Sequence, residues 1–141
     1  MQLWIDYLNS PSVEKELGSL RLVLLSGDWI PLSLPKQIKS FFPEAETISL
    51  GGATEASIWS IFYPIQHIEA NWQSIPYGYP MTNQRWYVLD ENLQSRPVWV
   101  TGQLYIAGVG LAKGYWQNPE KLMPVSSSIP IQEKDSIARE I

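Results

Sequence analysis

The sequence has 141 residues, of which 45% are hydrophobic and 17% charged, which suits one globular unit rather than a large multi-step enzyme. The formal net charge is −4 and the ten Lys and Arg residues form no basic stripe, which argues against nucleic-acid binding through phosphates. The absence of Cys excludes disulfides and thiolate zinc sites, and the single His excludes a metal site built from several His residues.

Apolar residues occur in short runs, and none approaches the roughly 20 consecutive apolar residues that cross a bilayer. The first residues also lack the basic start and apolar stretch of a secretion signal. We therefore expect a cytoplasmic location.

The first half of the chain has the pattern of a parallel βαβ unit. After a short amphipathic helix over residues 3–8, the run 20–25 is nearly all apolar, which is typical of a strand buried on both faces of a parallel sheet. A helix is predicted over 35–42, and a second buried strand over 47–50. Ligands bind such sheets at the carboxyl ends of the strands, where the Gly pair 51–52 lies.

The second half is richer in β-forming residues. Short runs at 85–89, 98–100 and 103–106 are separated by turns, which predicts antiparallel strands of a small sheet or barrel. The polar residues 90–92 between two of these runs are typical of a hairpin turn rather than of a metal site.

The expected fold class is therefore α/β. A partial parallel βαβ layer over residues 1–75 is followed by a small antiparallel, barrel-like part over 76–122, and residues 123–141 are interpreted as a tail without a clear pattern. Asn118, followed by Pro, resembles the start of a short helix. His67 is interpreted as a solvated loop residue.

Two Gly-rich loops are candidates for ligand binding. The loop 51–55 follows a predicted strand and opens a helical run, so its backbone N–H groups are candidates for contact with an anion at a helix N-terminus. The loop 108–114 lacks the Lys-Ser or Lys-Thr ending of a phosphate-binding loop and is the weaker candidate. From the residues alone, a plain turn and helix cap remain the alternative for the first loop.

Several ordered stretches resemble a known family. Residues 20–31, the run 51–57 and the stretch 102–115 occur in the order and at the intervals found in the large subdomain of nonribosomal peptide synthetase adenylation domains. Those domains belong to the adenylate-forming enzymes, which include acyl-CoA synthetases and luciferases. The resemblance covers about residues 1–122 and implies a fragment of such an adenylating core.

The resemblance implies that the first Gly-rich loop binds ATP. This loop consists of Gly51, Gly52, Ala53, Thr54 and Glu55, and it has Gly51 where the family usually has an aromatic residue. By analogy, the Thr54 hydroxyl would donate a hydrogen bond to an α-phosphate oxygen, and Glu55 would hold the Mg²⁺ ion that bridges the phosphates. The chemistry needs both, because a carboxylate that attacks phosphorus must overcome the repulsion between like charges.

The same resemblance places five residues in the pocket for the side chain of the amino-acid substrate. They are Leu24, Ser26, Leu50, Ile58 and Trp59. In the family, Leu, Ser, Leu, Ile and Trp in this order are associated with cysteine, and a small apolar cavity suits a thiol because a thiol behaves as a small hydrophobe. Ordinary core packing of all five residues is the alternative.

The resemblance also implies further partners. An intact domain would join cysteine to ATP, release pyrophosphate and pass the aminoacyl group to the phosphopantetheine thiol of a neighbouring carrier domain. The sequence lacks the family's upstream phosphate loop and substrate aspartate, and also its downstream ribose-binding aspartate and the small subdomain with its lysine. We therefore expect the chain to be inactive alone. Two alternatives remain: a non-catalytic remnant that serves as an interaction module, and a ligase for another amino or carboxylic acid.

Overall fold

A computed structural model describes residues 2–8, 10, 19–118 and 137–139 of the chain. These residues fall into two compact units. The first unit comprises Met1–Leu50 and Phe62–Gly78, and the second comprises Gly51–Ile61 and Tyr79–Ile141. The chain therefore enters the second unit once for a short loop, returns to the first, and then continues in the second.

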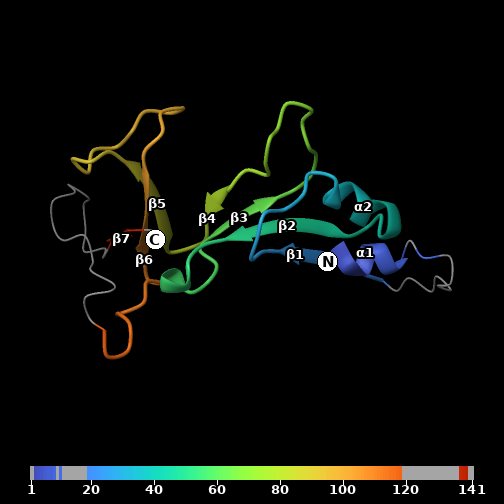
Figure 1. The fold of residues 1–141 in the computed structure, drawn as a ribbon, viewed down its shortest axis with the longest axis horizontal. Coiled ribbons are helices and arrows are strands. Elements are labelled where there is room, and N and C mark those ends of the chain that lie inside the picture. Colours follow the sequence, from blue (N-terminus) through green and yellow to red (C-terminus); the bar gives the residue numbers. More distant parts are fainter. Residues whose placement is uncertain (1, 9, 11–18, 119–136, 140–141) are drawn as a thin grey trace. The chain divides into compact units, whose positions relative to one another are not determined.

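The first unit contains the predicted strand–helix–strand arrangement (Figure 1). Its elements are α1 (Gln2–Leu8), β1 (Leu22–Leu25), α2 (Leu34–Phe41), β2 (Glu46–Gly51) and β3 (Ile61–Pro64). Strands β1 and β2 are parallel, and β2 lies between β1 and β3. The register places Val23 opposite Thr47 and Leu24 opposite Ile48. The parallel βαβ prediction is confirmed, with strand and helix ends shifted by one or two residues.

Helix α2 begins and ends with ordinary sequence signals. A Pro stands in its first turn, where its missing N–H is not needed, and Ser33 precedes the helix. At the other end, the Lys39 ammonium group donates a hydrogen bond to the Pro43 carbonyl oxygen at 2.9 Å, which places a cation beside the helix C-terminus. These two ends set the length of the helix that packs on the sheet.

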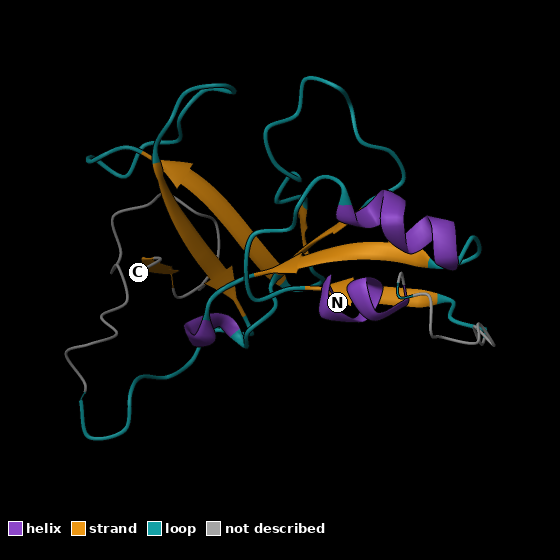
Figure 2. Cartoon of the chain, turned by 45° about the vertical axis from the view of Figure 1, so that its right-hand side comes forward, coloured by secondary structure: helices purple, strands orange, loops and turns teal. Residues whose placement is uncertain are grey.

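One face of the first sheet packs against the helices, which Figure 2 draws in purple beside the orange strands. Val23 and Leu25 are buried there, in one cluster with Ile38 of α2. Leu22 and Leu24 point to the opposite face, because side chains alternate along a strand, and they are 48% and 47% exposed. Burial of this strand on both faces was therefore a wrong prediction for the described residues, which provide a helical layer on one face only.

The second unit is built around an antiparallel sheet. The strands of this sheet are β5 (Gln84–Leu89), β6 (Gln103–Gly108) and β7 (Ile137–Arg139), while the short β4 (Tyr79–Pro80) is the last strand of the other sheet, which has the order β1-β2-β3-β4. The antiparallel sheet has the order β5-β6-β7, and both pairings are antiparallel. Parallel and antiparallel sheets together confirm the α/β class. Within the described residues, the antiparallel part is an open sheet rather than a closed barrel, and β7 lies in the segment that the sequence left without a pattern.

Two sequence predictions in the second unit have opposite outcomes. The turn at 90–92 is confirmed, since the backbone N–H groups of Asn92 and Gln94 donate to the Asp90 carboxylate at 2.9 and 2.8 Å. The prediction of a strand at 98–100 is wrong, because Val98 and Trp99 form a turn in which Trp99 is 100% exposed. Aromatic and β-branched residues favour strands only where a neighbouring surface packs against them. The helix predicted from Asn118 onward lies outside the described residues.

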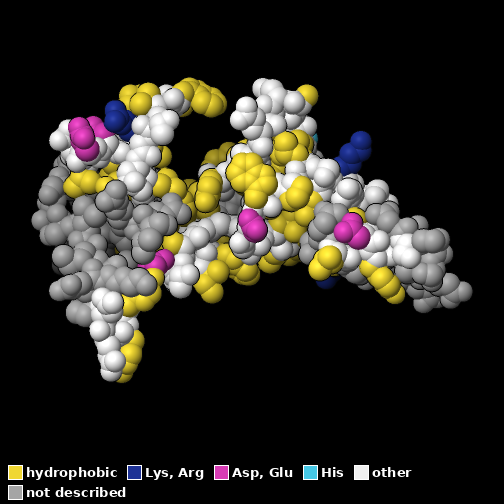
Figure 3. Space-filling view, in the orientation of Figure 1, with side chains coloured by type: hydrophobic (Ala, Val, Ile, Leu, Met, Phe, Trp, Pro, Cys, Tyr) yellow, Lys and Arg dark blue, Asp and Glu magenta, His cyan; other side chains and the backbone are white. Residues whose placement is uncertain are grey.

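Apolar side chains cover much of the face drawn in Figure 3. The exposed large residues come from both units and include Leu24, Trp29, Tyr79 and Trp116. Among the helices in the described ranges, none has the length and apolar character that crossing a bilayer requires.

Candidate functional site

The loop 51–60, which connects β2 to β3, closes on itself. The Ser60 N–H group donates to the Gly51 carbonyl oxygen at 2.9 Å, and the N–H groups of Ala56 and Ile58 donate to the Ala53 carbonyl oxygen at 2.9 and 3.1 Å. Only one turn of 3₁₀-helix forms, over Thr54–Ala56. The predicted helical run is therefore wrong, and the argument for anion binding at a helix N-terminus does not hold here.

The helical turn stops because two residues adopt left-handed backbone conformations. Ser57 has a φ angle of 60° and Ile58 one of 69°. Such angles are rare for a β-branched residue and cost about 1–3 kcal/mol, and strain of this kind clusters at functional sites. The conformation leaves the Ile58 side chain 64% exposed and that of Trp59 42% exposed.

Gly52 allows the loop to close tightly. Its φ angle is 146°, and a Cβ atom at this position would lie 2.6 Å from the Ile58 carbonyl oxygen and 2.8 Å from the Ser60 nitrogen. Both neighbours are backbone atoms, which cannot move aside by a side-chain rotation. The Gly residue is therefore required by the fold of the loop itself.

We expect Gly52→Ala to lower the free energy of unfolding by about 2 kcal/mol, because the left-handed backbone and the collision with Ile58 and Ser60 add together. Urea denaturation measures the change. Gly27→Ala is the matched control, since Gly27 has a φ angle of 92° but nothing within 4 Å of the added atom. Equal losses in the two variants would contradict the close packing of the loop.

The two predicted ATP-facing side chains lie on the 3₁₀ turn. Thr54 is exposed and Glu55 is half-buried. The Tyr115 hydroxyl donates a hydrogen bond to the Glu55 carboxylate. This bond raises the pKa of the Tyr115 hydroxyl above its ordinary value.

The second Gly-rich loop holds the first one in place. The Ala112 N–H group donates to the Glu55 carbonyl oxygen at 2.6 Å, and the Ser57 hydroxyl donates to the Gly110 carbonyl oxygen at 2.7 Å. The sequence analysis considered this loop only as a phosphate cradle and missed its role as a support. The available signal was that Tyr115 ends one of the stretches that resemble the family.

Two candidate substrate residues of the first unit share one face of its sheet. Leu24 on β1 is paired with Ile48, two residues before Leu50 on β2, so Leu24 and Leu50 both point away from the face that α2 covers. Leu50 is buried, and Ser26 is exposed just beyond β1. Ile58 and Trp59 belong to the second unit. The pocket of all five residues thus stays a prediction.

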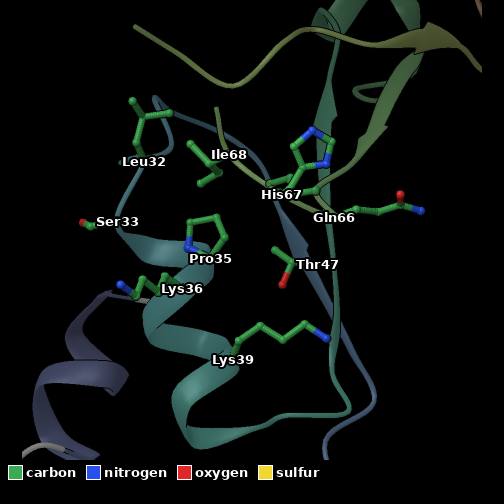
Figure 4. A pocket seen from close by; sticks show the side chains of 10 residues that line it. Leu32, Ser33, Pro35, Lys36, Lys39, Thr47, Gln66, His67 and Ile68 are labelled. Atoms are coloured by element: carbon green, nitrogen blue, oxygen red, sulfur yellow. The ribbon is translucent and has the colours of Figure 1, made fainter. Parts of the chain in front are cut away.

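A pocket of about 460 Å³ lies in the first unit between α2, β2 and the segment after β3 (Figure 4). Its lining residues are Leu32, Ser33, Pro35, Lys36, Lys39, Thr47, Ile65, Gln66, His67 and Ile68. His67 is an exposed loop residue, as predicted, and its ring lies 3.7 Å from the Glu69 carboxylate. The Thr47 hydroxyl is buried there and makes no hydrogen bond within the described part of the chain.

Replacing Thr47 with Val is expected to raise the free energy of unfolding by about 1 kcal/mol, because it removes a desolvated hydroxyl without changing the shape of the side chain. Equilibrium unfolding in urea gives the value. The exposed Thr101 offers the matched Thr→Val control, for which we expect a change within about 0.5 kcal/mol. A clear loss of stability in Thr47→Val would show that the hydroxyl has a hydrogen-bond partner in solution.

Comparison with known proteins gives concordant results. Residues 1–116 match the family described as AMP-binding enzyme. Bacitracin synthase 1 of Bacillus licheniformis is 64% identical over 102 residues, which are 72% of this chain and 2% of that protein. This chain therefore spans a small part of that relative's length.

The solved structures that resemble this chain include a nonribosomal peptide synthetase, FmoA3 (S1046A). It has a TM-score of 0.85 and 35% identity, over 98% of this chain and 15% of the other. Its α-methyl-L-serine-AMP-bound form has a TM-score of 0.79 and 40% identity, over 85% of this chain and 14% of the other. The family match, the sequence identity and the shared fold lead to one conclusion: this chain belongs to the AMP-binding enzyme family, as part of a nonribosomal peptide synthetase adenylation domain.

Proposed function

We propose that the chain supplies the ATP-facing loop and part of the amino-acid pocket of a domain that activates cysteine as cysteinyl-adenylate. The observation that carries the proposal is the compact loop 51–60, which holds Thr54 and Glu55 on one turn of 3₁₀-helix. A solved structure similar to this chain is described as bound to α-methyl-L-serine-AMP, an aminoacyl-adenylate. The same kind of ligand is therefore the appropriate one to consider here.

The residues of the loop fit a magnesium nucleotide. The described residues contain no cluster of three or more His, Cys, Asp or Glu residues, so a metal held only by protein side chains is not available among them. Mg²⁺ does not need one, because it commonly binds one or two carboxylates together with substrate phosphates and water. Glu55 would provide such a carboxylate, and Mg²⁺ bound there would neutralise phosphate charge.

Thr54 complements this role. Its exposed hydroxyl lies next to Glu55 in the chain and would donate a hydrogen bond to an α-phosphate oxygen. The donor and the carboxylate are held by the same turn, so they would act on the nucleotide together. Attack by the amino-acid carboxylate on the α-phosphorus would then release pyrophosphate.

The substrate side of the proposal rests on Leu24, Ser26, Leu50, Ile58 and Trp59. Leu24 and Leu50 share a sheet face in the first unit, and Ile58 and Trp59 lie three and four positions after Glu55 in the second. Four of the five side chains are apolar, which favours a small, weakly polar substrate side chain such as a thiol. The aminoacyl group would pass to the phosphopantetheine arm of a neighbouring carrier domain.

The test is amino-acid-dependent exchange of labelled pyrophosphate into ATP, measured on the intact protein to which this chain contributes. We expect exchange with cysteine, and none from residues 1–141 alone, because the sequence lacks the family's phosphate-loop and ribose-binding segments. Exchange without preference for any amino acid would reject the cysteine assignment. No exchange from the intact protein would favour the non-catalytic alternative.

A further inference from the structure

Three hydrogen bonds from the second Gly-rich loop and the tyrosine that follows it converge on one short turn. Tyr115 bonds the Glu55 side chain, Ala112 bonds the Glu55 carbonyl oxygen, and Gly110 accepts a bond from Ser57. Three contacts within residues 55–57 hold both the backbone and the side chain of Glu55. The loop therefore supports the functional side chain as well as the backbone of the turn.

A hydrogen bond to a carboxylate that binds a metal usually strengthens the binding. Glu has several rotatable bonds, and a metal that binds it must restrict all of them. Tyr115 restricts them in advance, while a carboxylate has about four acceptor sites and can bind a cation and a hydroxyl donor together. Partners of this kind typically change metal affinity by about 10- to 100-fold when they are removed.

We propose that Tyr115 is a positioning residue whose hydroxyl holds the Glu55 carboxylate in the orientation that binds the Mg²⁺ ion of Mg·ATP. The inference rests on the proposed function, since it needs Glu55 to be the metal-binding carboxylate. It gives the loop 108–114, together with Tyr115, a role in the affinity of the site for metal rather than in contact with phosphate.

The test measures metal binding directly. Mn²⁺, which is paramagnetic and takes the same oxygen ligands as Mg²⁺, replaces Mg²⁺ in this experiment. It is titrated into the intact protein with a non-hydrolysable ATP analogue, and bound Mn²⁺ is followed by electron paramagnetic resonance. We expect Tyr115→Phe to weaken Mn²⁺ binding by at least about tenfold, because it removes the hydroxyl that holds the Glu55 carboxylate and keeps the aromatic ring. Tyr79→Phe is the matched control, since Tyr79 belongs to the same unit and is 64% exposed, and its binding should equal that of the wild type.

A second measurement separates positioning from loss of folding. In pyrophosphate exchange, the Mg²⁺ concentration for half-maximal rate should rise about tenfold in Tyr115→Phe, with the maximal rate recovered at saturating Mg²⁺. A misfolded variant would not recover. Wild-type or tighter Mn²⁺ binding by Tyr115→Phe, alongside weak binding by Glu55→Gln, would overturn this inference alone. Undiminished binding by Glu55→Gln would instead overturn the metal assignment of the proposed function.

Discussion

Replacing Glu55 with Gln is expected to slow amino-acid-dependent pyrophosphate exchange by about 100- to 1000-fold. Gln keeps the size of the side chain and can still accept a bond from Tyr115, but it has no negative charge to hold Mg²⁺ between the phosphates. The repulsion between the attacking carboxylate and the α-phosphate would then be poorly offset. Initial rates at saturating ATP and amino acid, with Mg²⁺ varied, provide the measurement.

The control for this variant is Glu91→Gln. Glu91 is an exposed residue of the turn after β5, in the same unit as Glu55, so it reports the effect of losing one negative charge alone. We expect its exchange rate to remain within about twofold of the wild type, since isolated surface charges contribute little. Similar losses in the two variants, or no loss in Glu55→Gln, would contradict the role of Glu55.

Local patterns in the sequence predicted the parts of the fold that local chemistry determines. The apolar run of β1, the Pro at the start of α2 and the turn after β5 each depend on residues close together in the chain. The exposure of Leu24 depends instead on whether a second layer covers the sheet, and a run of apolar residues does not reveal this. The strand predicted around Trp99 was wrong for the same reason, because a local apolar pattern does not show whether a neighbouring surface packs against it.

The candidate site was predicted only in part, because its supporting contacts join distant residues. Glu55 and Tyr115 are separated by 60 positions, and no spacing rule connects them. The left-handed conformation of Ile58 could not be predicted from the sequence either, since β-branched residues rarely adopt it. The family resemblance named the residues that would face ATP, but the structure was needed to show that the second Gly-rich loop holds them.

Cysteine is expected to support pyrophosphate exchange about 10- to 100-fold better than serine in the intact protein. A serine hydroxyl that loses water in a mostly apolar pocket without a new partner costs about 1–3 kcal/mol, whereas a thiol loses much less. Ratios of kcat/KM for the two amino acids give the selectivity, with alanine as a probe of the contribution from the thiol itself.

Ser26, the hydroxyl-bearing residue of the proposed pocket, provides a second test of this selectivity. Ser26 is exposed just beyond β1 and could donate or accept a hydrogen bond with a substrate hydroxyl, which would reduce the discrimination. We therefore expect Ser26→Ala to increase the preference for cysteine over serine by about fivefold, because a serine substrate then loses the Ser26 hydroxyl as a hydrogen-bond partner. Ser40→Ala, on the exposed side of α2, is the matched control. If serine or alanine supported exchange as well as cysteine did, the pocket assignment would be wrong. The substrate would then be an amino acid with a different side chain.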